Sequence, residues 1–250
     1  MRLPLVQVAG VIDEAEGRVL AAAGVTHAGF PLRLPVNTPD TSERRAKEII
    51  AALPPSLIPV LITYLDTCDD IIDFCRDMNC FTIQLHGPVS IGELEKLRRM
   101  TSRLTVFKSL VIGENEVNDL IGFVAQAHPF VDAFITDTFD PVSGASGATG
   151  HVHDWLTTRR LVEESPKPVI LAGGLTARNV AAGIQATGCA GVDTHTGLEG
   201  PDGRKIPEAV RAFVDNARAA WRGLRESVKH KALGMSNGAI TGPTKRDPVH

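Results

Sequence analysis

Cysteine is scarce in this sequence of 250 residues, and none of its four copies is placed for a redox pair or a metal site. None forms a C-x-x-C pair, and none stands beside histidines at the spacing of a zinc ligand set. The four are Cys68, Cys75, Cys80 and Cys189. The sequence therefore predicts buried, reduced thiols and no bound metal.

Long apolar runs and a large excess of one charge are also absent. No stretch approaches the roughly 20 apolar residues that cross a bilayer, and the run at residues 1–9 is too short for the core of a signal peptide. The formal net charge is -3 and the pI is about 6.2, so the chain has no bulk attraction for nucleic acid or anionic membrane. We therefore expect a cytoplasmic protein without a nucleic-acid or membrane partner.

The sequence does hold enough apolar residues for one large core. Hydrophobic residues make up 43% of the chain and charged residues 22%, as is usual for globular domains. Short apolar runs, typical of buried strands, alternate with runs of helical periodicity. Strands are expected at residues 3–9, 25–30, 57–63, 81–85, 104–110, 131–136, 169–172 and 191–194. Helices are expected at residues 13–23, 41–53, 68–79, 91–100, 114–127, 153–164, 177–186 and 207–229.

This regular alternation predicts the α/β class and a single (β/α)8 barrel, the TIM barrel, over residues 1–230. A doubly wound open sheet also alternates strands and helices, but so many units of this length close most naturally into a barrel. Residues 231–250 have lost hydrophobic periodicity, so we expect a mobile C-terminal tail there.

Two glycine-containing stretches near the end of the barrel suggest a phosphate site. Gly173 and Gly174 follow one apolar run, and Thr196 and Gly197 follow the next. The loops after the last two strands of such barrels commonly bind phosphate through main-chain amides. We expect Thr176 to cap the helix at residues 177–186, so that the first loop lies near its positive end. The alternative is a tight strand-to-helix turn without a ligand.

Four motifs in register resemble the phosphoribosylanthranilate isomerase family of tryptophan biosynthesis. They are Gln84–Gly87, Gly147–Trp155, Leu171–Leu175 with Asn179–Val180, and Gly191–Asp193 with Thr196–Glu199. The resemblance spans roughly the first 200 residues. It implies a barrel enzyme that converts an aminoaldose phosphate into an aminoketose phosphate without metal or cofactor. It also implies that His86 and Asp193 belong to the substrate site.

The resemblance supplies an acid but no base. Asp137 follows the sixth apolar run and matches the family's general acid, although it could instead brace the glycine-rich loop that follows. The family's cysteine base lies in a Lys-x-Cys-Gly motif, whereas this chain has Gln7, Val8, Ala9 and Gly10. A methyl group cannot remove a proton, and a positioned base contributes roughly 100-fold to 10,000-fold in rate.

The loop that grips the substrate's aromatic acid differs as well. The family's arginine in a Ser-Pro-Arg stretch aligns near Thr38 and Pro39 here, and Arg33 is the nearest arginine that could bind substrate instead. Recognition of the anthranilate ring is therefore expected to have changed, while the phosphate platform is retained.

Several polar residues are candidates for a new base. His195 can serve as a base or as a phosphate ligand, because imidazole titrates near neutral pH. Asp66 can be a base, although a place in the N-cap region of the next helix is favoured. Lys108 resembles an ordinary residue of the family, so it is less favoured as a new base. A metal bound by His151 and His153 with Asp154 is disfavoured, because a two-residue spacing beyond a flexible loop is weak evidence for zinc.

Three functions remain open at this point. The leading hypothesis is an isomerase of this family that acts on a phosphorylated sugar derivative by acid–base proton transfer. The second is a different sugar-phosphate isomerase, epimerase or lyase on the same platform, and the third is a phosphate-ester-binding protein without turnover. All three share a small phosphorylated partner. A homodimer is one assembly that the sequence leaves open.

Overall fold

The computed structural model describes residues 4–35, 38–113, 116–138 and 155–236, and it shows a closed barrel of parallel strands. Strands follow one another around the barrel in sequence order, and the last pairs with the first. The strands are β1 (Leu5–Ala9), β2 (His27–Pro31), β3 (Ile58–Thr63), β4 (Thr82–Leu85), β5 (Thr105–Ile112), β6 (Ala133–Thr138), β7 (Val169–Leu171) and β8 (Gly191–Thr194). The prediction of a (β/α)8 TIM barrel is confirmed.

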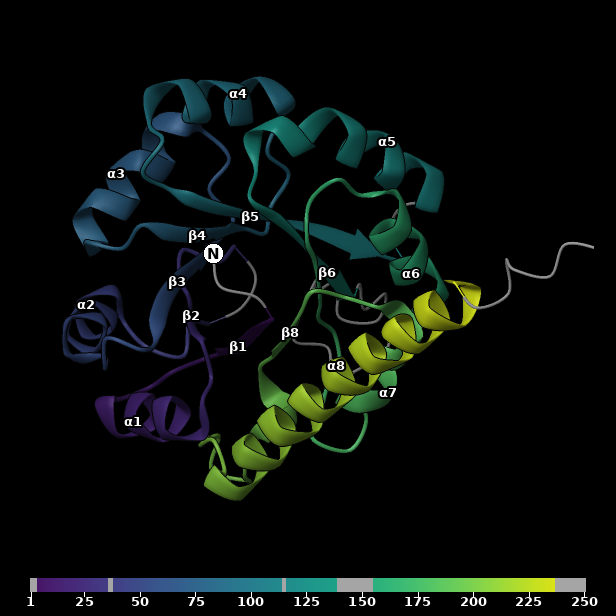
Figure 1. Cartoon of the computed structure of the whole chain (residues 1–250). Coiled ribbons are helices and arrows are strands. Elements are labelled where there is room, and N and C mark those ends of the chain that lie inside the picture. The colour runs from purple at the N-terminus through teal and green to yellow at the C-terminus, as the bar shows by residue number, and fades with distance from the viewer. Residues whose placement is uncertain (1–3, 36–37, 114–115, 139–154, 237–250) are drawn as a thin grey trace, which may run out of the picture.

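Helices form an outer ring around the strands (Figure 1). They are α1 (Glu14–Ala23), α2 (Glu43–Ala52), α3 (Cys68–Met78), α4 (Ile91–Met100), α5 (Val117–Ala127), α6 (Trp155–Glu164), α7 (Val180–Thr187) and α8 (Pro207–Ser236), with short 3-10 turns η1 (His128–Phe130) and η2 (Thr196–Leu198). Helix α8 packs on α1 and α7. It extends to Ser236, beyond the expected end near Lys229, and the rest of the expected tail, residues 237–250, lies outside the described residues.

The helix boundaries follow from local capping. Asp13, Ser42, Thr67 and Ser90 each accept a hydrogen bond from a backbone amide of the first turn, which satisfies a donor that the helix cannot pair. At the other end of α1, Gly24 adopts a left-handed conformation with φ 86° and closes the helix. Most predicted boundaries therefore lie within a few residues of the observed ones.

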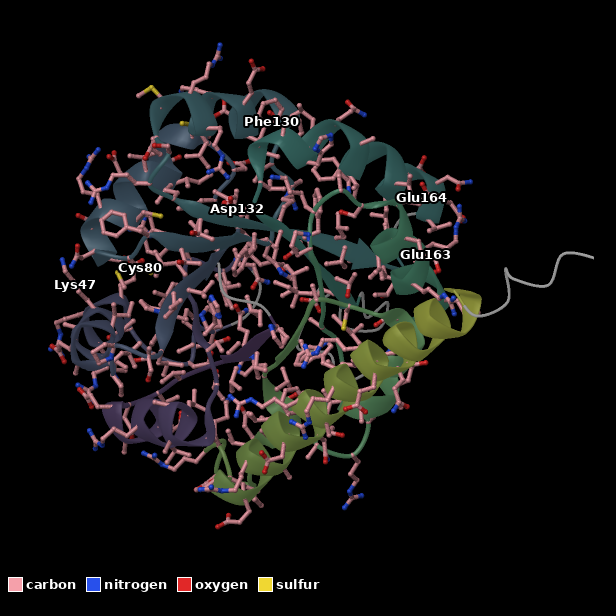
Figure 2. All side chains as sticks on the ribbon, in the orientation of Figure 1. Lys47, Cys80, Phe130, Asp132, Glu163 and Glu164 are labelled. Atoms are coloured by element: carbon pink, nitrogen blue, oxygen red, sulfur yellow. The ribbon has the colours of Figure 1, made fainter. Side chains whose placement is uncertain are left out.

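Two apolar layers lie on either side of the strands. Alternate strand residues point toward the barrel axis, and the inner layer consists of Leu5, Ala9, Val60, Ile62, Phe107, Ala133, Ile135, Ile170 and Ala172. The larger outer layer fills the space between strands and helices. Figure 2 shows side chains filling both spaces. The same alternation turns the polar Gln7, Gln84 and Asp193 inward, toward the axis.

All four cysteines are buried and unpaired, as predicted. Burial raises the pKa of Cys75 to about 12 and that of Cys80, labelled in Figure 2, to about 11, so these thiols stay protonated near neutral pH. Within the described ranges, no group of three or more His, Cys, Asp or Glu side chains is arranged to hold a metal ion. No described helix is both long enough and apolar enough to cross a membrane.

Candidate active site

A small cavity of about 70 Å³ lies at the carboxyl ends of β6, β7 and β8. One water needs roughly 10–15 Å³, so the cavity has room for a small anion. It is lined by Asp137, Ala172, Gly173, Gly174, Leu175, Thr176, Asp193, Thr194, His195, Thr196 and Gly197. The structure therefore brings the expected acid, both glycine loops and His195 to one place. We call this the glycine-loop cavity.

The loop after β7 is shaped by two glycines and one asparagine. Gly173 and Gly174 have φ of 95° and 60°, a left-handed region that other residues rarely adopt. Oδ1 of Asn179 accepts from the Thr176 amide at 2.8 Å, and its Nδ2 donates to the Gly174 carbonyl at 2.9 Å. The asparagine thus holds the loop in a fixed curve from the side away from the cavity.

One local prediction about this loop is wrong. Helix α7 begins at Val180, with Asn179 as its N-cap, and not at Ala177 with Thr176 as its cap. The Thr176 hydroxyl instead accepts from the Arg178 amide at 3.2 Å, which stabilises a turn that precedes the helix. The glycines therefore lie one turn farther from the helix than expected.

The loop after β8 is joined to the first loop. The Thr194 hydroxyl donates to the Leu175 carbonyl at 2.6 Å. A Cβ on Gly197 would lie 1.9 Å from that same carbonyl oxygen, so only glycine allows this approach. On the outer side, Lys205 is buried, its Nζ pairs with Glu199 and its amide donates to Glu16 of α1 at 3.0 Å. These contacts fix the second loop against the barrel.

The backbone amides in the two loops are available to an anion. The amides of Gly174, Thr196 and Gly197 donate to no acceptor within the described part of the chain. Gly174 and Gly197 are half-buried and Thr196 is exposed. A phosphate oxygen is a suitable acceptor for such amides. This arrangement supports the predicted phosphate site.

Asp137 projects from β6 into the mouth of the barrel, with 6% of its surface exposed. Its Oδ2 lies 3.7 Å from Nδ1 of His86, which follows β4. Nδ1 of His86 also lies 3.2 Å from the Ser109 hydroxyl. His86 thus lies between a hydroxyl and the expected acid, and its place in the substrate site stays a prediction.

A chain of amide side chains continues from Ser109 across the barrel. Nε2 of Gln84 donates to the Ser109 hydroxyl at 3.2 Å, and Nε2 of Gln7 donates to Oε1 of Gln84 at 2.9 Å. Gln7 in turn pairs with Asp193 in the register of β1 and β8. A polar layer therefore lies directly beneath the cavity and reaches from Asp137 to Asp193.

Asp193 is a carboxyl group at the mouth whose pKa is strongly raised. Burial and the nearby charge of Asp137 raise its pKa to about 7, although His195 and Gln7 act in the opposite direction. The residue is 8% exposed, and none of the described residues that line the cavity is a lysine or arginine. Asp193 therefore titrates near neutral pH, unlike an ordinary aspartate.

His195 lies against the backbone that follows Ala9. A Cβ on Gly10 would lie 2.1 Å from Nε2 of His195, so the imidazole occupies the space beside the position of the missing cysteine. Nε2 lies 3.2 Å from Oδ1 of Asp40 and 3.6 Å from Oε1 of Glu199. Burial opposes ionisation of Asp40, but the hydrogen bond and the charge of His195 outweigh it and hold the Asp40 pKa below its usual value.

The sequence did not point to Asp40. It lies in the loop between β2 and α2, beyond three prolines, where no periodicity predicts its direction. The single signal in the sequence was its place near Pro39, in the loop that carries the family's arginine.

Other candidates lie away from the cavity. Arg33 donates to Glu43 through Nε at 2.9 Å and Nη2 at 3.1 Å, and its guanidinium stacks on the Phe74 ring at 4.2 Å, so the structure does not bring it to the site. Asp66 is exposed, and its neighbour Thr67 is the cap of α3. The metal-site candidates His151, His153 and Asp154, together with the motif Gly147–Asp154, lie outside the described residues.

A second cavity of about 420 Å³ opens beside His86, between the loop after β4, the end of β5 and helix α5. Tyr64 packs on His86 with ring centroids 4.8 Å apart, and both line this space. Lys108 lies on the wall, donates to the Ser109 carbonyl at 2.8 Å, and has a pKa lowered to about 8 by burial. His86 thus adjoins Asp137 on one side and a larger, mostly apolar space on the other.

Comparison with known proteins gives a family for this arrangement. A model of the family "N-(5'phosphoribosyl)anthranilate (PRA) isomerase" matches residues 19–216, which begin after β1 and the position of the missing cysteine. The N-(5'-phosphoribosyl)anthranilate isomerase of Haloferax volcanii is 37% identical over 86% of this chain and 93% of the relative. The N-(5'-phosphoribosyl)anthranilate isomerase 2 of Methanosarcina mazei is 34% identical over 83% of this chain and 91% of the relative.

Solved structures agree on the fold. Phosphoribosylanthranilate isomerase from Thermotoga maritima matches with a TM-score of 0.72 and 23% identity over 86% of this chain and 98% of that one. A 3-hexulose-6-phosphate synthase from Salmonella typhimurium matches with a TM-score of 0.64 and 13% identity over 86% of this chain and 99% of that one. The family model and the curated relatives go further than the fold, and they show that this chain belongs to the N-(5'-phosphoribosyl)anthranilate isomerase family.

Proposed function

We propose that this protein isomerises a phosphorylated aminoaldose to the corresponding aminoketose, with phosphoribosylanthranilate or a close relative as substrate. The observation that carries the proposal is the glycine-loop cavity, which places free loop amides and the carboxyl group of Asp137 around one small space. The named activity of the relatives in Haloferax and Methanosarcina agrees with it. The substrate is thus a small phosphate ester, and no cofactor takes part in the proposed steps.

The proposed chemistry is a short series of proton transfers on a phosphate-anchored sugar. Amides of Gly174, Thr196 and Gly197 bind the phosphate and fix the sugar over the barrel mouth. Asp137 gives a proton to the ring oxygen as the sugar opens, and a base removes the proton from the carbon next to the amine-bearing carbon. The resulting enolamine then takes up a proton at the amine-bearing carbon while its enol hydroxyl loses one, which gives the aminoketose. His86, 3.7 Å from Asp137, lies close enough to orient the acid.

His195 is the base in this proposal, in place of the cysteine that Ala9 has replaced. Its ring lies beside Gly10, the residue that follows position 9, and it reaches the mouth of the barrel from the segment after β8. A carboxylate on Nε2 favours the tautomer with the proton on that nitrogen, and the other nitrogen then keeps its lone pair. Asp40, at 3.2 Å, is that carboxylate.

The changed loop favours a second candidate, a different sugar phosphate as substrate. Arg33 is paired with Glu43, and it is turned toward α2 and α3. The space beside His86 is therefore left to bind the non-phosphate half of the substrate by contacts that differ from the family's arginine grip. A phosphorylated aminoaldose with another amine substituent fits the same proton transfers.

Turnover and binding assays test the proposal together. Purified protein should convert phosphoribosylanthranilate or a related aminoaldose phosphate, and Asp137→Asn should abolish conversion while ribose 5-phosphate still binds. Asp66→Asn, an exposed carboxyl away from the cavity, is the matched control and should leave both unchanged. Ribose 5-phosphate binding without conversion of any such substrate would instead indicate a binding protein. The absence of both binding and turnover would remove the proposal.

We also infer that the chain assembles as a homodimer and works in the cytoplasm. One solved neighbour is described as a dimeric phosphoribosylanthranilate isomerase from Thermotoga maritima, which supports the first inference. Light scattering of the purified protein should give twice the mass of 26.7 kDa, and cell fractionation tests the location. A mass equal to that of one chain at micromolar concentration would contradict the dimer.

A further inference from the structure

Lys108 is a buried lysine that the proposed proton transfers do not use. It lies on β5 with 5% of its surface exposed, and burial lowers the pKa of its amine to about 8. Lys205, the other buried lysine of the described chain, is paired with Glu199. Lys108 has no such carboxylate partner among the described residues. A buried amine without a counter-ion is costly, so its place here requires an explanation.

The ammonium group of Lys108 has hydrogen-bond donors to spare. An ammonium carries three N–H donors, and Nζ of Lys108 donates to the Ser109 carbonyl at 2.8 Å. Nζ also lies 5.8 Å from the centre of the Phe123 ring of α5, whose face stabilises a cation. In the described part of the chain, Nζ makes no other hydrogen bond or ion pair. Donors of the amine are therefore available to a ligand.

These donors lie on the wall of the 420 Å³ cavity beside His86, which we call the Lys108 cavity. Small-molecule pockets commonly have volumes of about 300–1,000 Å³. The wall is mostly apolar and includes Tyr64, Leu120 and Phe123. Asp119 also lines the cavity, but it is exposed in the first turn of α5, so water screens its charge. One buried cation in an apolar wall suits a carboxylate with an apolar body.

The Lys108 cavity lies across the barrel from the glycine-loop cavity. The loop after β4 and the end of β5 form the first, and the loops after β7 and β8 form the second. In the closed strand order, β4 is opposite β8. The two spaces adjoin where His86, on the wall of the larger one, lies 3.7 Å from Asp137 of the smaller one. A substrate with its phosphate in the glycine loops can therefore extend its other end toward Lys108.

We propose that Lys108 binds the carboxylate of an acidic amine substituent on the phosphorylated sugar, and that the Lys108 cavity selects acidic over neutral substituents. The proposal rests on the function proposed above and names the chemistry of the non-phosphate half of the substrate. It gives the counter-ion role to a lysine on β5, because Arg33 is engaged by Glu43. The apolar body of the substituent then packs against Tyr64 and Phe123.

A pair of probes that differ in one charge tests the acid preference. Anthranilate carries a carboxylate, and 2-aminobenzamide has the same ring with a neutral amide. By isothermal titration calorimetry, the wild type should bind anthranilate about 10-fold to 100-fold more tightly, the range that a charge-assisted hydrogen bond supplies. Lys108→Met should remove this preference. Lys47→Met, at an exposed lysine of α2 labelled in Figure 2, is the matched control and should retain it.

Three results of this titration would overturn the proposal. They are the absence of anthranilate binding, equal affinity of the wild type for the two probes, and an unchanged preference in Lys108→Met.

Tyr64 reports the place of binding in the wild type, whether or not the methionine variant folds. It is the single tyrosine of the chain, so the signals of its ring protons are assigned without ambiguity. Bound anthranilate should show intermolecular NOEs to this ring, because Tyr64 lines the Lys108 cavity. Anthranilate that binds without NOEs to Tyr64 would occupy another place and would overturn the proposal.

Ribose 5-phosphate separates this proposal from the phosphate site. Lys108→Met should bind it with wild-type affinity, because Lys108 lies outside the glycine-loop cavity. A wild type that binds anthranilate with the expected preference but does not bind ribose 5-phosphate would remove the phosphate site and leave the acid site standing. Parallel loss of both probes in Lys108→Met would show that the lysine supports the whole barrel mouth, which would contradict its assignment to the acid group.

Discussion

Replacing Asp193 with asparagine should stabilise the fold at alkaline pH and have little effect at acid pH. The pKa of Asp193 is about 7 in the folded chain, against 3.8 for an ordinary aspartate such as that of the unfolded chain, a difference of about three units. The folded state therefore binds the proton more tightly than the unfolded state, so stability falls as pH rises from about 4 to about 7 and then levels off. At about 1.4 kcal/mol per unit, the cost above pH 7 is on the order of 4 kcal/mol.

Asparagine removes this dependence, because its amide is neutral at every pH. Urea unfolding at pH 5 and pH 8 measures the effect as the difference between Asp193→Asn and wild type at each pH. We expect the variant's advantage to be several times larger at pH 8 than at pH 5. Asp66→Asn is the control and should show no such trend. A difference between variant and wild type that is the same at both pH values would show that the pKa of Asp193 is not raised in the folded chain.

Three further substitutions test other parts of the account. Gly174→Val should weaken ribose 5-phosphate binding by roughly 10-fold to 100-fold and leave the circular dichroism spectrum unchanged. The substitution adds a side chain in the cavity, at a residue with φ of 60°, and removes amide contacts to the phosphate of about 1.5–3 kcal/mol. Unchanged affinity would exclude this loop from the phosphate site. Ala9→Cys should raise phosphoribosylanthranilate turnover little or not at all, because the loop expected to bind the anthranilate ring has changed too. A gain near 100-fold would show that position 9 was the main defect. Phe213→Ala should lower the free energy of unfolding in urea by about 3–5 kcal/mol, because this fully buried side chain packs α8 against the core. A decrease below about 1 kcal/mol would mean that α8 is not part of the barrel core.

The barrel could be predicted from the sequence because its strands are short apolar runs and its helices carry clear caps. Ser42 and Ser90, each followed by an amphipathic run, mark their helices correctly. Thr176 led to a wrong start for α7, because a hydroxyl before an apolar run also stabilises a turn. The N-cap of α7 is Asn179, whose side-chain oxygen accepts from the Thr176 amide.

The site was predictable where residues follow a strand directly. Asp137 and Asp193 sit at strand ends, and parallel strands place all such ends at one face of the barrel. Asp40 could not be predicted, because it reaches His195 from a loop 155 residues away in sequence. The pairing of Gln7 with Asp193 in strand register depends on the closure of β8 onto β1, and that register is set by the whole barrel.

The most direct test of the central claim is the turnover number of His195→Ala relative to the wild type with phosphoribosylanthranilate or a related aminoaldose phosphate. The account places His195 beside the missing cysteine as the base, so turnover should fall by roughly 100-fold to 10,000-fold. Ribose 5-phosphate affinity should change far less, because the loop amides that bind the phosphate remain. Full turnover without the imidazole, or loss of phosphate binding in proportion to turnover, would contradict the account.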